Sequence, residues 1–250
     1  MSDEPNPMRR AQAAMRAVLP KRFFREVSTE PRDEGHVLLL DGRPTRTPAR
    51  RLLALPNVKF AEAVADEWRA LGDVIDPAAM PLTRLSNLAI DAVAVAPAPV
   101  IDEIAHYAGS DLLYYRAAEP EGLVAEQNAQ WNPVIAALEA RLSVRFRLAE
   151  GIVHVAQAEE ALTAIRREAE ALSHPFALAA VASATNLSGS ALIALALAAG
   201  LLSGDEAWNA AHVDEQWNIS RWGEDADAQV RLAARHAEFT AAARTLRLVR

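Results

Sequence analysis

The sequence contains no cysteine, and this absence removes several kinds of site at once. Disulfide bonds, thiolate zinc sites and cysteine nucleophiles are all excluded. Glycine is scarce as well, with ten in 250 residues, and no glycine-rich loop follows a predicted strand. The sequence therefore offers no counterpart to the phosphate-binding loops of nucleotide-hydrolysing enzymes.

Organised catalytic groups are also missing. No two of the six histidines have the i, i+4 spacing of a helical zinc site, and there is no Gly-x-Ser-x-Gly elbow. Carboxylates are plentiful, and pairs such as Asp76 with Asp91 or Glu215 with Glu224 could carry acid–base chemistry. We therefore predict a protein without catalytic residues, metal or cofactor, and keep a helical enzyme with one of these pairs as an alternative.

The charge is unevenly distributed along the chain. The net charge is −7, but residues 1–60 carry twelve Lys and Arg against seven Asp and Glu, and the rest carry fourteen against twenty-six. A chain that is acidic over most of its length repels phosphate backbones. Nucleic acid is therefore not expected as a partner.

No membrane insertion is predicted. Residues 171–204 contain no Asp, Glu, Lys or Arg, but the polar residues 184–190 divide this run into two apolar pieces. Each piece is about a dozen residues long, which is too short to span a bilayer, so two closely packed buried helices are expected. The N-terminus begins with Asp3 and Glu4 and lacks a long apolar region, unlike a secretory signal. We expect a cytoplasmic protein with a mobile tail over residues 1–20.

The periodicity predicts an α+β fold with a small N-terminal β-sheet/α domain (21–75) and a larger, mainly α-helical bundle domain (76–250). In the first domain, a strand at residues 36–41 ends in the hairpin signal Asp41-Gly42, and a helix at 57–71 begins at the cap residue Asn57. Strand-like patterns in the second domain occupy 111–116 and 144–148. Its helices are expected at 81–95, 98–108, 121–142, 157–172, 175–187, 189–200, 205–222 and 225–247.

The segment HVDEQWNISRWGEDADA at residues 212–228 is unusual because it combines two tryptophans with five carboxylates. One helix is predicted from the N-cap Asp205 to Gly223. At about 100° per residue, Val213 and Trp217 lie opposite a second face. That second face consists of Trp208, Ala211, His212, Glu215, Ile219 and Trp222. A helix with two apolar faces is buried on both sides, or packs on one side and presents the other to a partner.

Two interpretations of this segment remain open. Glu215 forms a salt bridge within the fold, or it lies among tryptophans in an interface and meets a basic group of a partner. Tryptophan and charged residues at the centre of an interface often contribute most of the binding energy. The candidate partner-binding residues are Glu215, Glu224, Trp222, Trp208 and Asp214.

Several ordered motifs resemble one known family over residues 21–247. They are KRFF at 21–24, LDGRP at 40–44, TRTP at 45–48, MPLTRL at 80–85, YAGSDLL at 107–113, LSGS at 187–190, VDE with Trp217 at 213–217, and WGED at 222–225. The chain resembles the assembly chaperones of mitochondria and alphaproteobacteria that handle the α subunit of the F-type ATP synthase headpiece.

This resemblance implies a two-domain, non-catalytic protein that covers the subunit-interface surface of the free α subunit until a β subunit assembles. In the family an acidic position of the C-terminal Trp/Glu segment matters, and Glu215 and Glu224 both match it. The short acidic N-terminus suggests a bacterial member, and we expect a monomer. A scaffold or adaptor for another complex is the remaining alternative.

Overall fold

The first unit of the fold is built on a small antiparallel sheet covered by one helix. The computed structural model describes residues 19–151 and 153–250. Its contacts separate two units, one ending at Arg84 and the other beginning at Leu85. The elements of the first unit are β1 (Val27–Arg32), β2 (Gly35–Leu40), β3 (Arg43–Pro44), β4 (Ala54–Leu55), α2 (Val58–Arg69), the 3-10 turn Pro77–Ala79 and the start of α3 (Pro81–Leu88). Residues 1–18 of the predicted tail (1–20) lie outside the described residues. The predicted domain limits, 21–75 and 76–250, stay predictions.

The β2–β3 hairpin forms where the sequence predicts it. Leu40 pairs with Arg43, so Asp41 and Gly42 are the two loop residues, and both have positive φ angles, 48° and 73°. Short loops of this kind match the twist of the strands they join. The Asp41 carboxylate also accepts hydrogen bonds from the backbone N–H groups of Arg25 and Glu26, which fixes the preceding segment beside the turn.

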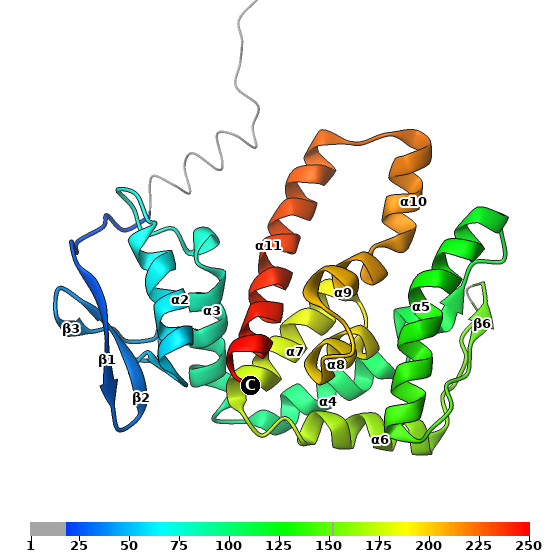
Figure 1. The fold of residues 1–250 in the computed structure, drawn as a ribbon, viewed down its shortest axis with the longest axis horizontal. Coiled ribbons are helices and arrows are strands. Elements are labelled where there is room, and N and C mark those ends of the chain that lie inside the picture. The colour runs from blue at the N-terminus through cyan, green and yellow to red at the C-terminus, as the bar shows by residue number, and fades with distance from the viewer. Residues whose placement is uncertain (1–18, 152) are drawn as a thin grey trace, which may run out of the picture. The chain divides into compact units, whose positions relative to one another are not determined.

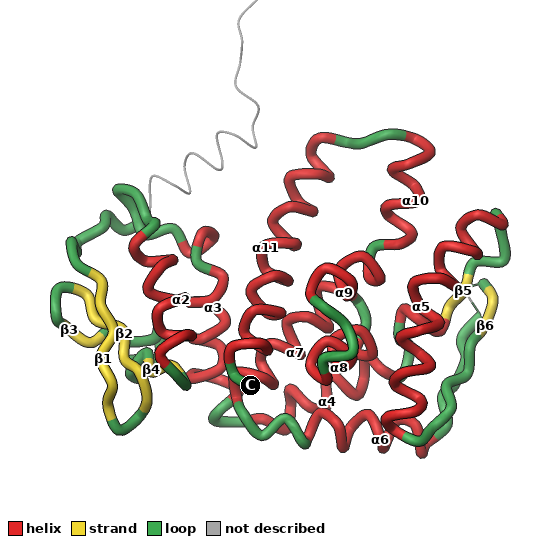
Figure 2. Tube along the Cα trace, in the orientation of Figure 1, coloured by secondary structure: helices red, strands yellow, loops and turns green. Residues whose placement is uncertain are grey.

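Helix α2 covers this sheet with one apolar face. Asn57 caps the helix by accepting a 3.0 Å hydrogen bond from the N–H of Phe60, as predicted. Phe60, Val64 and Trp68 follow at helical spacing and are buried. Figure 2 shows the strands in yellow with α2 packed beside them.

The second unit is mainly helical, and its elements follow one another with short connections. They are the remainder of α3, the π-helix Ala89–Val93, α4 (Pro97–Ala108), the 3-10 turn Leu112–Tyr114, β5 (Tyr115–Arg116), α5 (Glu121–Leu142), β6 (Ala149–Glu150), α6 (Glu159–Glu170), α7 (Pro175–Ser188), α8 (Ala191–Ala199), α9 (Gly204–Ala211), α10 (Val213–Trp222) and α11 (Ala226–Leu248). The predicted α+β fold is confirmed.

Helices α7 and α8 form the centre of the second unit. They occupy the run without charged side chains, where two helices are predicted, and Gly189 and Ser190 join them. Helix α8 is buried on every side from Ala191 to Leu197, and α7 packs against α4, α8 and α11 (Figure 1). The small alanine side chains let these helix backbones approach closely. Among the described residues, no helix is both long enough and apolar enough to cross a membrane.

Two predicted strands differ from the structure. Residues 144–148 belong to no strand, and the strand lies just beyond them in β6. Residues 111–116 form a 3-10 turn followed by β5, which pairs with β6 in parallel. The alternating pattern did not locate β6, because the pairing depends on the distant partner strand and not on local sequence.

A buried carboxylate joins the 3-10 turn to the α8 N-terminus. Asp111 is completely buried. One oxygen accepts hydrogen bonds from the Ser190 hydroxyl (2.7 Å) and the Leu113 N–H (3.1 Å), and the other accepts from the Leu192 N–H (3.0 Å). These donors favour the charged carboxylate, but burial outweighs them and raises the pKa of Asp111 to about 6.

We expect Asp111→Asn to destabilise the protein most at low pH. The amide has only one accepting oxygen, so a buried N–H loses its partner and the free energy of unfolding falls by about 1–3 kcal/mol. The raised pKa means that the stabilising contribution of Asp111 is complete below its ordinary pKa of 3.8 and is lost as the pH rises through about 6. The difference in the free energy of unfolding between wild type and variant should therefore decrease by up to about 3 kcal/mol as the pH rises across this range.

Denaturant unfolding at several pH values measures this difference. Asp102→Asn is the control, because Asp102 lies on the surface, where it pairs with Arg166, so its effect should be small at every pH. A difference for Asp111→Asn that stays constant from pH 4 to pH 7 would contradict the raised pKa.

Candidate functional site

A break at His212 divides the helix predicted for residues 205–222 into α9 and α10. That prediction was wrong in one further respect, because Ser203 and not Asp205 caps the start. The Ser203 side chain accepts from the Glu206 N–H, and the Glu206 carboxylate accepts from the Ser203 N–H, which is a capping box. Asp205 lies in the first turn of α9.

Two side-chain hydrogen bonds account for the break. The carbonyl of Trp208 accepts a 2.8 Å hydrogen bond from the Nδ1 atom of the His212 ring, while the His212 backbone N–H turns to the carbonyl of Asn209. The two rings stack with their centroids 3.7 Å apart. From α5, the indole of Trp131 donates a 2.7 Å hydrogen bond to the carbonyl of Ala210. Side chains therefore bond two carbonyls at the end of α9, and a new helix begins at Val213.

His212 itself is buried and largely uncharged at neutral pH. Burial lowers its pKa, although the Trp208 carbonyl and the nearby Glu215 carboxylate oppose this shift. The ring atom Nε2 lies 3.4 Å from a carboxylate oxygen of Glu215 and forms no hydrogen bond in the described part of the chain. Glu215 is therefore not held by an ionic partner on this side.

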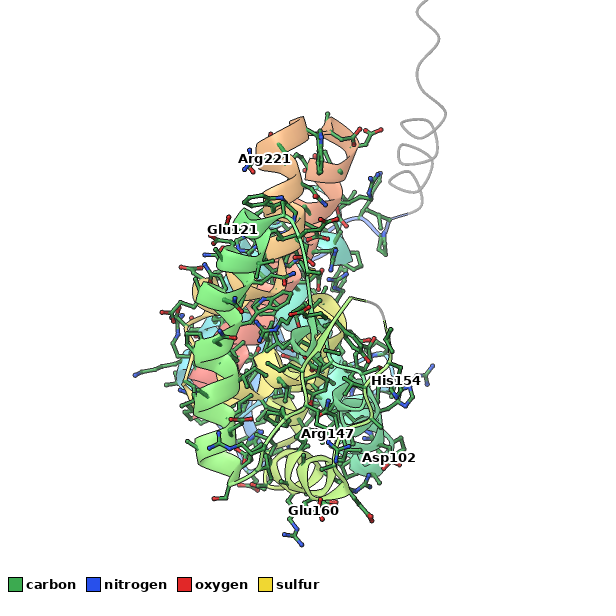
Figure 3. The ribbon with its side chains drawn as sticks, turned by 90° about the vertical axis from the view of Figure 1, so that its right-hand side faces the viewer. Asp102, Glu121, Arg147, His154, Glu160 and Arg221 are labelled. Atoms are coloured by element: carbon green, nitrogen blue, oxygen red, sulfur yellow. The ribbon has the colours of Figure 1, made fainter. Side chains whose placement is uncertain are left out.

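One face of α10 rests on α5. Trp217 lies against Gly122 so closely that a Cβ atom at Gly122 would overlap its ring, and the Arg221 guanidinium covers the same ring at 4.6 Å. One turn before Trp217 in α10, the carboxylate of Asp214 accepts a 2.7 Å hydrogen bond from the side-chain amide of Gln127 in α5. Figures 1 and 3 show α10 beside the upper part of α5, with Arg221 near the start of that helix at Glu121.

The other face of α10 borders an open groove. The α10–α11 groove has a volume of about 490 Å³ and a mostly apolar lining. It is lined by Glu215, Asn218, Ile219, Trp222, Gly223 and Asp225 on one side and by Ala228, Gln229, Arg231, Leu232 and Arg235 on the other. The side chain of Trp222 is 78% exposed. Glu215 is 51% exposed and lies 3.8 Å from Arg235, at the limit of an ion pair.

Comparisons with known proteins show what this chain is similar to. A family model described as the ATP12 chaperone protein matches residues 21–139. The structure of the Atu1473 protein from Agrobacterium tumefaciens is 42% identical with a TM-score of 0.88, and the match covers 99% of this chain and 93% of that one. Crystal structures of Atp12 from Paracoccus denitrificans, native and with an aspartate replaced by lysine, are 37% identical with TM-scores of 0.84 and coverage of 92% of this chain and at least 98% of theirs.

The chain belongs to the ATP12 chaperone family. A more distant relative, the mitochondrial protein atp12 of Schizosaccharomyces pombe, is 24% identical over 220 residues, which are 83% of this chain and 75% of the relative. The family expected from the sequence motifs is thereby confirmed. Because the Agrobacterium structure matches almost the whole chain, the similarity includes the helices of the α10–α11 groove.

In this ATP12 family member, the five candidate partner-binding residues have three different environments. Glu215 and Trp222 line the groove. Asp214 and Trp208 contact other elements of the fold: Asp214 accepts a hydrogen bond from Gln127 of α5, and the ring of Trp208, which is 8% exposed, contacts His212 and, from α11, His236 and Phe239. Glu224 is exposed in the loop after α10 and does not line the groove.

None of the candidate residues predicted from the sequence lies on the α11 side of the groove. Ala228, Leu232 and Arg235 form this wall, and their i, i+4, i+7 spacing is the signal that could have revealed it. The supporting residues Gly122 and Gln127 gave no local signal. Within residues 19–151 and 153–250, no group of three or more His, Cys, Asp or Glu side chains could hold a metal ion.

We expect Gly122→Ala to displace α10 and destabilise the protein. Alanine is better than glycine in a helix by up to about 1 kcal/mol, so without the Trp217 contact the change would stabilise α5. The overlap with the ring should instead lower the free energy of unfolding by about 1–3 kcal/mol. Equilibrium unfolding measures this change, and in a Trp217→Ala background the penalty should disappear.

Gly72→Ala provides the matched control, because a Cβ atom at Gly72 meets nothing within 4 Å. Its effect should stay within about 0.5 kcal/mol. A penalty for Gly122→Ala that persists without the Trp217 ring would show that this contact does not position α10.

Proposed function

We propose that this chain is a non-catalytic assembly chaperone that binds the free α subunit of the F-type ATP synthase through the α10–α11 groove. It shields the surface of α that later contacts a β subunit. The exposed Trp222 beside Glu215 in an apolar groove is the observation that carries this proposal, together with membership of a chaperone family. We also propose that the chain acts as a monomer in a bacterial cytoplasm.

The groove has the chemistry of a protein-binding surface. Trp222 and Ile219 offer apolar area that a partner would remove from water, and a large exposed aromatic side chain in such a patch marks an interaction site. The charged residues around them, including Glu215 and Arg231, resemble the polar rim of an interface that forms and dissociates. A client chaperone needs this balance, because it must release the α subunit to its final partner.

Glu215 is suited to meet a basic group of the client. It is half exposed, its contact with Arg235 is long, and the neighbouring His212 is buried and mostly neutral. A client arginine or lysine in the groove would give this carboxylate a shorter, charge-assisted hydrogen bond. Of the two acids that match the family position, Glu215 lies in the groove and Glu224 outside it, which favours Glu215.

The geometry offers little support for an enzyme. Asp76 accepts a hydrogen bond from the Ala78 N–H and caps a 3-10 turn, which is a structural use of this carboxylate. Glu215 and Glu224 do not share a pocket. An acid–base pair requires two carboxyl groups that face one substrate.

Size-exclusion chromatography with the isolated α subunit tests the proposal, with the β subunit as control. We expect co-elution with α and not with β. Separate elution of α, or its aggregation as in the absence of this chain, would contradict the proposed client.

We expect Glu215→Lys to abolish the complex while the thermal unfolding midpoint stays within a few degrees of wild type. Reversing this charge leaves the basic group of the client facing a lysine. Substitutions of residues that dominate an interface weaken binding by at least about 30-fold. Trp222→Ala should weaken binding similarly, because it removes the exposed aromatic surface. Affinities measured by calorimetry or surface plasmon resonance provide the comparison.

Glu224→Lys is the matched control, since it makes the same charge change in the same segment outside the groove. Its affinity should remain within a few-fold of wild type. Equal losses for Glu215→Lys and Glu224→Lys would indicate a general electrostatic effect and contradict a specific role of the groove.

A further inference from the structure

A second groove lies in the first unit, at the end of the β2–β3 hairpin. This β3 groove has a volume of about 590 Å³. It is lined by Phe23, Leu40, Asp41, Arg43, Pro44, Thr45, Arg46 and Trp68. The tight turn at Asp41-Gly42 brings β3 back along β2, and α2 contributes Trp68. Nothing in the chaperone proposal uses this surface.

The apolar part of the β3 groove contains an exposed aromatic ring. Phe23 is 73% exposed. Its ring meets the buried Phe24 edge-on at 5.5 Å, and Phe24 in turn contacts Trp68 at 5.6 Å. The exposed ring is therefore fixed to the core of the unit through an aromatic chain and is not a loosely attached side chain. A partner that covers Phe23 would gain apolar contact without having to order this support.

Two buried polar groups of the same groove have no hydrogen-bond partner. Within residues 19–151 and 153–250, the indole Nε1 of Trp68 and the hydroxyl of Thr45 are shielded from water and unbonded. Most buried polar groups in proteins do have a partner. An indole N–H can only donate, and a hydroxyl can donate as well. Both groups therefore suit a ligand that brings hydrogen-bond acceptors.

The positive charge at the groove also favours a ligand that carries hydrogen-bond acceptors. Arg43 and Arg46 are exposed at its edge, and guanidinium groups bind carboxylates with paired hydrogen bonds. Arg46 uses one nitrogen for a 2.8 Å hydrogen bond to the Arg50 carbonyl, which orients its side chain. The one acid in the lining, Asp41, already accepts two backbone N–H groups.

We propose that the β3 groove binds an acidic segment of a partner protein, with an apolar side chain against Phe23 and carboxylates at Arg43 and Arg46. The apolar lining favours a peptide over nucleic acid, because Phe23, Leu40 and Pro44 offer nothing to a phosphate backbone. The surface lies within the first unit, whereas the α10–α11 groove lies in the second. This proposal does not depend on the identity of the client.

The probe is a fluorescein-labelled peptide that alternates glutamate and leucine, titrated with the full chain in a fluorescence anisotropy assay. We expect binding that Arg43→Glu weakens at least tenfold, because the variant opposes the peptide carboxylates with a new negative charge. Lys59→Glu is the matched control, since it makes the same charge change at an exposed position of α2 that does not line the groove, and its affinity should be unchanged.

A second measurement locates the peptide. In a ¹H–¹⁵N correlation spectrum, the indole N–H of Trp68, assigned with Trp68→Phe, should shift downfield when an acceptor reaches it. The ATP synthase α subunit is absent from both assays, so they can fail while the client proposal holds, and the reverse also applies.

Any of three results with the peptide would overturn the proposal. They are no binding of the acidic peptide up to millimolar concentration, equal affinity for Arg43→Glu, and an unchanged Trp68 indole resonance at saturation. Binding of a single-stranded DNA oligonucleotide as tight as that of the peptide would also overturn it, because the groove would then recognise negative charge alone.

Discussion

The hydrogen bond from the His212 ring to the Trp208 carbonyl determines which tryptophans a partner can reach. In a continuous helix a backbone N–H would bond this carbonyl, and α9 and α10 would share one axis. Because a side chain takes its place, α9 keeps Trp208 in the core, and α10 leaves in a new direction to rest on α5. The groove between α10 and α11 exists only because of this change of direction.

The sequence predicted those elements whose causes are local. Asp41-Gly42 requires only the two backbone conformations of a tight turn, and Asn57 caps α2 through a neighbour three residues away. The charge-free run around Gly189 was predicted correctly as two helices, although residues 184–188 of the expected divider belong to α7 and the break falls at Gly189 and Ser190. The break at His212 was missed, since it depends on ring stacking and on Trp131 of a distant helix.

The same distinction applies to the candidate site. Helical spacing placed Glu215, Ile219 and Trp222 on one face and Trp217 on the other, and the structure places these residues on the groove and on α5 respectively. Spacing could not separate Trp208 from Trp222, because burial depends on which helices cover each ring. It could not rank Glu215 above Glu224 either, since both acids match the family position and only the fold shows which of them lines the groove.

The contact between Gly122 and Trp217 links two positions that are far apart in the sequence. The absence of a side chain on α5 determines how near α10 can come, and therefore how wide the groove is. Across the family these two positions should consequently covary, with a larger residue on α5 accompanied by a smaller ring on α10. A relative that carries both a β-carbon on α5 and a tryptophan on α10 should have these two helices further apart. Its α10 would then lie nearer α11, and the narrower groove would accept a slimmer client surface.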